Sequence, residues 1–397
     1  MGMQDNRSAN CRFLERFSFD RLIAPLTPEE FRTQYWEQKP MVAHRGDANF
    51  YDDLLTLEDF DRAIATGPDY IKTAEAKSKK SIRIEVETNP GLERTLTEMH
   101  RGATLVLDRL HLREPKLGLL CRLLEGQLGH CFNTNIYLTP PNGQGFTPHW
   151  DGHDVFILQV LGSKNWRLEK QRRKFPGKDE NMADESREFV GDCDAFTLNQ
   201  GDMVYIPRGF VHAAECGSEA SLHITLGLLP FNWSDLLYAA IKATVQEQES
   251  LLHALPLGFL SGNRDELVRG LKSALKNAAD EQFLGQVVER FKDEVVTKFP
   301  LDVSGQVTNF FRPAELKATH IVGPRAGIVY RMRHNEEIVR LNFGARTIDF
   351  LGLFREALEF ALENSAYAIR DLPGDLHDEE RIALVERLIQ EGLVVRK

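Results

Sequence analysis

Residues 147–151 read Thr-Pro-His-Trp-Asp, and residues 206–212 read Ile-Pro-Arg-Gly-Phe-Val-His. In an extended strand, residues two apart point to the same face, so His149 and Asp151 present an imidazole and a carboxylate side by side. Together with His212 from a second strand end, two nitrogens and one oxygen can occupy one face of a metal. This arrangement leaves the other coordination positions open and is typical of non-haem Fe(II) sites. An isolated His-x-Asp is also consistent with a surface turn, so the surrounding residues decide the interpretation.

The neighbouring segments predict strands that end at the candidate ligands. Residues 143–148 are rich in Gly and Pro, which predicts that His149 starts a strand after a turn. The apolar run 155–160 predicts a buried strand closed by a turn at 161–163. A turn at 199–202 then precedes the strand 203–207, which leads to His212. This succession predicts a small β-barrel that holds a metal at its mouth.

The same two-residue spacing occurs at two further places. Asn135 and Tyr137 form one pair, and His223 and Thr225 form another. If the strands enclose one cavity, all these polar side chains can point inward, where they need a hydrogen-bonding partner. For His223, a structural histidine buried in the core is an equally good interpretation.

At this point the sequence resembles a known family, the JmjC-type cupin oxygenases, and within it the ribosomal oxygenase branch. The matching stretches are 133–137 (NTNIY), 147–151 (TPHWD), 154–160 (DVFILQV), 162–166 (GSKNW), 201–212 (GDMVYIPRGFVH) and 221–225 (SLHIT). The resemblance implies a double-stranded β-helix barrel. It also implies an enzyme that uses Fe(II), O₂ and 2-oxoglutarate to hydroxylate a protein side chain, typically a ribosomal one.

The resemblance also implies roles for individual residues. Asn135, Tyr137 and Thr225 would line the 2-oxoglutarate pocket, with His223 nearby, and the Lys164 ammonium would pair with the distal carboxylate of 2-oxoglutarate. The alternative for Lys164 is an exposed lysine in a turn, which is the usual place for this residue. Arginine-hydroxylating relatives tend to carry Arg at this position and histidine-hydroxylating ones Lys. The hydroxylated residue, His or Arg, is therefore left open.

Composition narrows the class of protein. The chain has 397 residues, of which 42% are hydrophobic and 27% charged, and its formal net charge is −10. This charge argues against a protein that coats nucleic acid and permits a basic partner such as a ribosomal protein. No apolar run reaches the roughly 18 residues of a membrane span. The N-terminus lacks the apolar core of a signal peptide, and the five cysteines show no CxxC spacing, so we expect a cytoplasmic protein with reduced thiols.

We expect an α+β chain in four parts. They are an N-terminal α/β flank of the barrel (1–100), the catalytic barrel (101–230), a helical region (231–300) and a winged-helix-like domain (301–397). Apolar stripes such as Leu237, Ile241 and Val245 predict core-packed helices. The resemblance implies that the helical region forms a homodimer. Residues 351–397 hold 10 acidic against 6 basic residues, which argues against direct DNA binding by the last part.

Three alternatives remain open at this stage. A metal cupin of another enzymatic type, which does not use 2-oxoglutarate, would share the three candidate ligands. A binding module that has kept the barrel without turnover is a second alternative. The third is an oxygenase of the same kind whose substrate is a non-ribosomal peptide or a small molecule. The charged segment 169–187 is interpreted as a loop, either a solvated hairpin extension or a rim of the substrate site.

Overall fold

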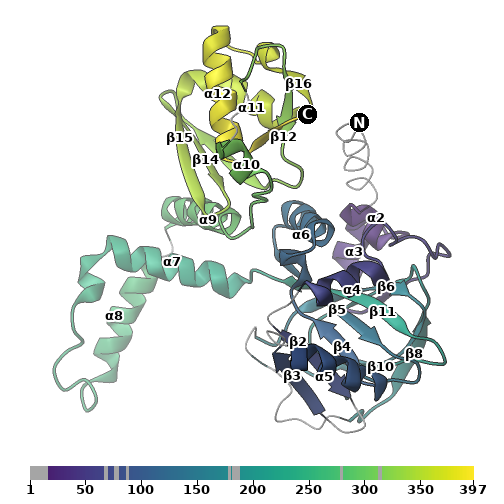
Figure 1. The fold of residues 1–397 in the computed structure, drawn as a ribbon. Helices are drawn as coiled ribbons and strands as arrows, with labels where there is room; N and C mark the ends of the chain where they lie inside the picture. The colour runs from purple at the N-terminus through teal and green to yellow at the C-terminus, as the bar shows by residue number, and fades with distance from the viewer. Residues whose placement is uncertain are drawn as a thin grey trace. The chain divides into compact units, whose positions relative to one another are not determined.

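The computed structural model describes residues 17–66, 70–75, 80–85, 89–177, 180, 188–277, 280–311 and 315–397. The chain divides into two compact units, residues 1–230 and 231–397, which we describe separately (Figure 1). Residues 1–16, which the sequence also predicts to be helical, lie outside the described residues, as do 178–179 and 181–187 of the loop expected over 169–187. The described part of that segment begins in a strand, because β7 continues to Gln171.

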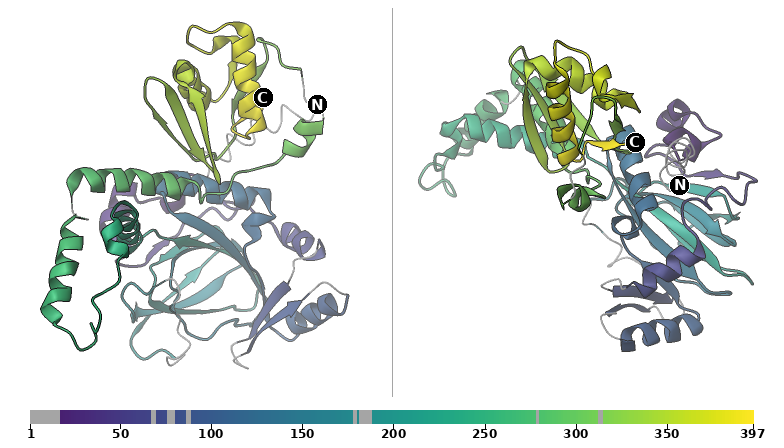
Figure 2. Two further views of the ribbon diagram at one scale, coloured as in Figure 1. Left: turned by 90° about the vertical axis from the view of Figure 1, so that its left-hand side faces the viewer. Right: turned by 45° about the horizontal axis from the view of Figure 1, so that its top comes forward.

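Two antiparallel sheets form the centre of the first unit. The larger sheet has the strand order β1-β9-β6-β11-β5-β4-β2-β3, and the smaller has the order β10-β7-β8. The strands are β1 (Met41–Ala43), β2 (Tyr70–Glu75), β3 (Lys80–Glu85), β4 (Thr104–Leu107), β5 (Cys131–Thr139), β6 (Asp154–Leu161), β7 (Lys164–Gln171), β8 (Cys193–Leu198), β9 (Met203–Ile206), β10 (Phe210–Glu215) and β11 (Ser221–Leu229). The sheets can be followed from two further directions in Figure 2.

Apolar side chains fill the space between the two sheets at one end of the barrel. They alternate along each strand, as expected for strands with one face turned inward. The buried cluster consists of Val155, Ile157, Trp166, Leu168, Leu198, Val204, Ile206 and Phe210. Val155, Ile157 and Trp166 of this cluster also line the cavity described below, together with polar residues.

Helices cover the outer face of the larger sheet. Those of the first unit are α2 (Phe19–Ile23), α3 (Pro28–Gln34), α4 (Leu57–Ala65), α5 (Asn89–His100), the 3₁₀ turn η1 (Leu110–Leu112) and α6 (Pro115–Leu128). Helix α3 begins as its sequence predicts, with Thr27 and Glu30 in a reciprocal capping box and Pro28 in the first turn. Its Phe31 contacts the rings of Phe156 and Tyr205, which point out of the barrel.

Strand register aligns polar residues across the inner face of the larger sheet. On β11, His223 lies opposite Tyr137 of β5, and Thr225 lies opposite Asn135. Residues directly opposite on neighbouring strands share a face. The alternate residues of β11, namely Leu222, Ile224, Leu226 and Leu228, are fully buried. One face of this strand therefore forms the apolar core, and the other forms a polar wall.

The candidate motif differs from its prediction in one respect. His149 does not start a regular strand, because β6 begins only at Asp154. Residues 149–151 are extended but pair with β10 at a single isolated bridge, between His149 and His212. The bridge uses the outer edge of β10, because the other edge pairs with β7, where the register shifts between Phe210 and His212.

The second unit begins with helices. They are α7 (Trp233–Glu247), the 3₁₀ turn η2 (Glu249–Leu252), α8 (Arg264–Asn277), α9 (Glu281–Val296) and α10 (Gln306–Phe311). Helix α7 is capped by Asn232, and the prediction that Leu237 and Ile241 pack into the core is wrong. The helix instead packs on Val287 of α9 through the small residues Ala240 and Ala243, which allow close approach of the two backbones. Leu237 and Ile241 are 59% and 43% exposed.

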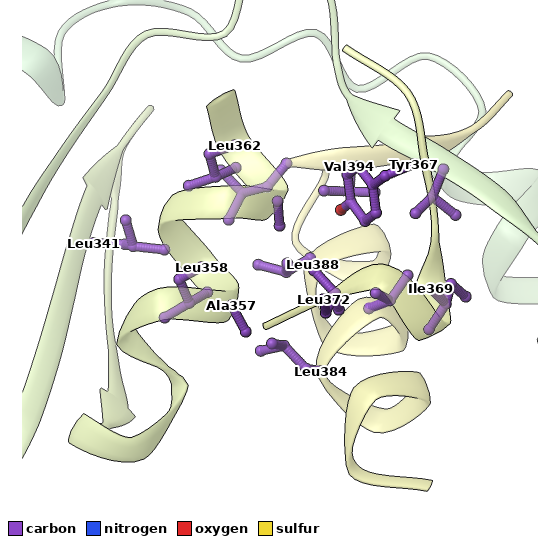
Figure 3. Packing of buried hydrophobic residues seen from close by; sticks show 14 of the residues in the cluster. Leu341, Ala357, Leu358, Leu362, Tyr367, Ile369, Leu372, Leu384, Leu388 and Val394 are labelled. Atoms are coloured by element: carbon purple, nitrogen blue, oxygen red, sulfur yellow. The ribbon is translucent and has the colours of Figure 1, made fainter. Parts of the chain in front are cut away.

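The end of the chain folds around one apolar core. Its elements are β12 (Ile321–Pro324), β13 (Tyr330–His334), β14 (Ile338–Phe343), β15 (Arg346–Leu351), η3 (Gly352–Phe354), α11 (Arg355–Glu363), β16 (Tyr367–Ala368), η4 (Ile369–Asp371), α12 (Asp378–Gln390) and β17 (Val394–Arg396). Figure 3 shows Leu358 of α11 and Leu384 and Leu388 of α12 in this core. Residues 346–351 pair with β14 as a third strand, so the helix that follows, α11, begins only at Arg355.

Candidate metal and cosubstrate site

Backbone hydrogen bonds join the two segments that carry the candidate metal ligands. The amide of His149 donates to the carbonyl of His212 (3.1 Å), and the amide of His212 donates to the carbonyl of His149 (2.8 Å). The amide of Gly209 donates to the carbonyl of Asp151 (3.1 Å). Trp150, between the two candidate ligands, is buried against Val211. This alternation places His149 and Asp151 on one side of the segment, as the two-residue spacing predicts.

The three candidate side chains converge on one point. One potential ligand atom from each of His149, Asp151 and His212 lies within 4.8 Å of the others. The Nε2 atom of His212 is 3.7 Å from an Asp151 carboxylate oxygen, and the two imidazole centroids are 4.6 Å apart. An ion placed among these atoms would have two nitrogen ligands and one oxygen ligand on a single face.

Hydrogen bonds fix which nitrogen of each histidine faces this point. The Nδ1 atom of His149 lies 2.9 Å from the carbonyl of Thr147, and that of His212 lies 3.1 Å from the carbonyl of Phe210. A carbonyl only accepts, so each Nδ1 carries the proton and each Nε2 keeps a free lone pair. Metal-binding histidines are commonly oriented by such a bond.

Protonation states also suit a metal. Burial, with a further contribution from His149, lowers the pKa of the His212 imidazole to about 4, so the ring is neutral near pH 7. Burial acts to raise the pKa of the Asp151 carboxyl, but neighbouring imidazoles outweigh it, and the pKa lies below its ordinary value. A neutral imidazole and an ionised carboxylate are the forms that coordinate metals.

The three residues open onto a cavity of about 280 Å³ inside the barrel. The other five residues selected from the sequence also line it: Asn135, Tyr137, Lys164, His223 and Thr225. The rings of Tyr137 and His223 stack with centroids 4.8 Å apart. All eight residues selected from the sequence therefore surround one space.

Lys164 supplies a cation to this cavity. It begins β7, is only 4% exposed, and its Nζ donates to the Thr139 hydroxyl (2.9 Å). Thr139 also contacts the hydroxyl of Thr104, at 3.0 Å. Burial lowers the pKa of the Lys164 ammonium to about 8, so the group is still mostly charged at pH 7. A buried ammonium without a carboxylate partner is costly, and an anionic ligand would reduce this cost.

Two buried polar atoms of the cavity wall point to a ligand as well. Nδ1 of His223 and Nε1 of Trp166 have no hydrogen-bond partner among the described residues. Both residues line the cavity. Unpaired buried polar atoms are rare in folded proteins and are expected where a ligand binds. The residues present thus fit a metal at one end of the cavity and an anionic cosubstrate that reaches Lys164.

The sequence reasoning missed several polar residues at this site. Thr139, which accepts the hydrogen bond from Lys164, continues the alternation of Asn135 and Tyr137 along β5, so the same spacing rule could have found it. Lys72 and Asp108 line the cavity, and they come from β2 and from the residue after β4. No local pattern marks these two residues, because their position depends on how distant strands pair.

With this geometry established, comparisons with known proteins can be interpreted. Residues 114–236 match the family model of the JmjC domain. These residues form a JmjC domain. The domain includes all three candidate ligands and Lys164, and its strands β5, β6, β7 and β11 build the cavity wall. The resemblance to JmjC oxygenases proposed from the sequence is thus confirmed.

Relatives of the JmjC domain are found among ribosomal oxygenases. The chain is 31% identical over 271 residues to ribosomal oxygenase 1 of Gallus gallus, and the alignment covers 64% of this chain and 45% of that protein. It is 28% identical over 343 residues to ribosomal oxygenase 2 of Mus musculus, and this alignment covers 81% of this chain and 71% of that protein. The chain thus spans less than half the length of the first relative.

The fold around the JmjC domain is also known from solved structures. The ribosomal oxygenase YcfD of Escherichia coli, in complex with cobalt and 2-oxoglutarate, has a TM-score of 0.58 and 18% identity. The match covers 94% of this chain and 98% of YcfD. At this identity the likeness concerns the fold, and it extends well beyond the JmjC domain. The described helices include none that is both long enough and apolar enough to span a membrane.

Proposed function

We propose that this chain is an Fe(II)- and 2-oxoglutarate-dependent oxygenase that hydroxylates a side chain of a ribosomal protein. One observation carries the proposal: a His-Asp-His cluster and a buried lysine face the same cavity. The ribosomal oxygenase names of the relatives, and the cobalt and 2-oxoglutarate of YcfD, support the cofactors and the substrate class. His149, Asp151 and His212 would hold Fe(II), and Lys164 would bind the distal carboxylate of 2-oxoglutarate.

The protein's own contribution is positioning and exclusion of water. Bound Fe(II), 2-oxoglutarate and O₂ would supply the oxidising chemistry, with succinate and CO₂ as by-products. The carbonyls of Thr147 and Phe210 hold the two imidazoles in the orientation that presents Nε2 to the metal. Asn135, Tyr137 and Thr225 would line the cosubstrate pocket, and His223 stacks on the ring of Tyr137. With only three protein ligands, a bound Fe(II) would keep positions open for cosubstrate and O₂.

The alternatives predict different cavities. A metal cupin without 2-oxoglutarate has no need for a buried ammonium at the far end of the cavity, whereas Lys164 is 4% exposed and lacks a carboxylate partner among the described residues. A binding module without turnover has no need for three convergent ligand side chains. A non-ribosomal peptide or small-molecule substrate remains the alternative that only a search for the product can exclude.

Further parts of the proposal concern the rest of the chain. We propose that residues 231–300 form a homodimer, because Trp233, Leu237 and Tyr238 are 87%, 59% and 70% exposed along α7. A row of exposed apolar residues this large is typical of an interaction surface. We also propose four parts with boundaries near residues 100, 230 and 300, of which the last is winged-helix-like and does not bind DNA. The reduced thiols expected from the sequence favour a cytoplasmic location.

The experiment that tests the proposal is succinate formation from 2-oxoglutarate with added Fe(II), with and without extracted ribosomal proteins. Wild-type protein is compared with His149→Ala and Lys164→Ala. We expect turnover that the extract stimulates and that both variants lose, with a +16 Da shift on a His or Arg residue. Metal binding without turnover of 2-oxoglutarate in any extract would contradict the proposal.

A further inference from the structure

A second carboxylate faces the cavity beside the JmjC strands. In the register of β4 with β5, Val106 lies opposite Tyr137, so Asp108, two residues on, lies on the same face and next to Asn135. The amide of Arg109 donates to Oδ1 of Asn135 (3.0 Å), which ties this turn to the cavity wall. Asp108 lines the cavity, and its side chain is only 12% exposed. After burial and Asp151, the Asp108 charge is the next influence that raises the pKa of Tyr137, in accord with a carboxylate directed at the site.

Asp108 is paired with Lys72, a lysine that has no role in the proposed metal and 2-oxoglutarate sites. Nζ of Lys72 on β2 forms an ion pair with Asp108, and the Tyr70 hydroxyl donates to the same carboxylate at 3.1 Å. The Lys72 side chain is 40% exposed and also lines the cavity. An ion pair with a half-exposed lysine is weak in water, so another cation can replace Lys72 at little cost.

The charges in the cavity identify Asp108 as the group available to a substrate. Among the described lining residues, Asp108 and Asp151 are the only carboxylates, and Lys72 and Lys164 are the only lysines. Asp151 belongs to the candidate metal cluster, and Lys164, which donates to Thr139, is the cation proposed to bind 2-oxoglutarate. Among the described lining residues, Asp108 is therefore the one carboxylate that is free to bind a substrate rather than the metal. Because it is negatively charged, it favours a cationic group.

We propose that Asp108 binds a cationic side chain of the substrate, and that Lys72 occupies Asp108 until this side chain displaces it. The inference rests on the proposed function, which it narrows to substrates with a charged side chain at the site. Displacement keeps the charge at Asp108 balanced, whereas a neutral or acidic side chain would leave Lys72 in place. A guanidinium fits best, because its planar donors can reach both carboxylate oxygens at once.

Two matched peptides test the proposal. Acetyl-Gly-Gly-Arg-Gly-Gly-amide and its citrulline counterpart have nearly the same shape and differ in charge. Their dissociation constants are measured by calorimetry or NMR titration on the full chain loaded with Co(II) and 2-oxoglutarate. The arginine peptide is expected to bind about ten-fold more tightly or better, in line with a charged hydrogen-bonded contact. The Asp108→Asn variant is expected to bind both peptides equally.

Substitution of Lys72 gives a change of opposite sign. If Lys72 holds Asp108 in about nine-tenths of molecules, Lys72→Met should tighten the arginine peptide about ten-fold and leave the citrulline peptide unchanged. A role in stability alone would not produce tighter binding. The exposed residues Asp20 and Lys116 lie outside the cavity lining, so Asp20→Asn and Lys116→Met serve as charge-matched controls.

The outcomes separate this inference from the proposed function. Equal binding of the two peptides to wild-type protein, or no tightening in Lys72→Met, would overturn the role of Asp108. A neutral histidine peptide that binds as tightly as the arginine peptide at pH 8 would also overturn it. If the Co(II)-loaded wild-type protein does not bind 2-oxoglutarate, the proposed function is overturned instead. The peptide titration, repeated on the metal-free chain, would still test Asp108.

Discussion

Replacement of Lys164 by methionine should make the free protein more stable while it abolishes cosubstrate binding. Burial lowers the pKa of Lys164 from 10.5 to about 8. Each pKa unit corresponds to about 1.4 kcal/mol, so the buried charge costs the folded state about 3 kcal/mol at neutral pH. Methionine has a similar length without the charge. Thr139 keeps its contact with Thr104 when the ammonium is removed. We expect a gain of about 1–3 kcal/mol in the free energy of unfolding.

The pH dependence has a definite sign. Lys164 is protonated up to about pH 8 in the folded chain and up to about pH 10.5 in the unfolded chain. Its charge therefore lowers stability fully below pH 8, and the penalty disappears as the pH rises from 8 to 10.5. The difference between variant and wild type should shrink over this interval.

Urea unfolding followed by tryptophan fluorescence measures the effect, because Trp150 and Trp166 are buried in the first unit. Lys170→Met is the matched control, since Lys170 lies on the same strand but is exposed. No gain in Lys164→Met at pH 7, or a gain that grows toward pH 10, would refute the reasoning. So would 2-oxoglutarate binding of wild-type strength in that variant.

The remaining predictions concern the metal, the cosubstrate and the turn beside them. His212→Ala should weaken Co(II) binding more than about a hundred-fold in calorimetry, because loss of a residue that only supports a metal ligand already costs about 10–100-fold. The same substitution at the exposed His100 should leave Co(II) binding unchanged. Calorimetric titrations should give a 2-oxoglutarate affinity that is constant below pH 8 and falls above it as Lys164 loses its proton. The same dependence of affinity on pH in Lys164→Ala would contradict this prediction. Gly209→Ala should cost at least about 1 kcal/mol in urea unfolding, because Gly209 has φ +82° and a Cβ would lie 1.8 Å from the Arg173 carbonyl oxygen. Gly217→Ala, with open space around it, should have little effect.

Much of the site could be predicted because its residues follow strand periodicity. The two-residue spacing of His149 and Asp151, of Asn135 and Tyr137, and of His223 and Thr225 directs each pair to one face, and the structure brings all six to one cavity. Thr139 obeys the same rule and was overlooked only because its hydroxyl is less distinctive than an amide or an imidazole.

What could not be predicted depends on tertiary pairing. Lys72 and Asp108 meet because β2 pairs with β4, a register that no local pattern specifies. The mutual backbone bonds of His149 and His212 replace the regular strand expected at the motif. In the second unit, the periodicity identified α7, but a stripe of large apolar residues does not show whether this chain or another surface covers it.

The two-faced strand β11 makes folding accuracy and ligand binding inseparable. It pairs with β5 over nine residues and with β6 over seven, and its alternate side chains His223 and Thr225 line the cavity. A slip of one position would turn these two residues toward the helices and bring apolar side chains to the ligands. The burial of the apolar face, from Leu222 to Leu228, opposes such a slip. Only a chain in which β11 has the correct register can therefore bind metal and cosubstrate. Binding of the two can serve to separate correctly folded chains from misfolded ones.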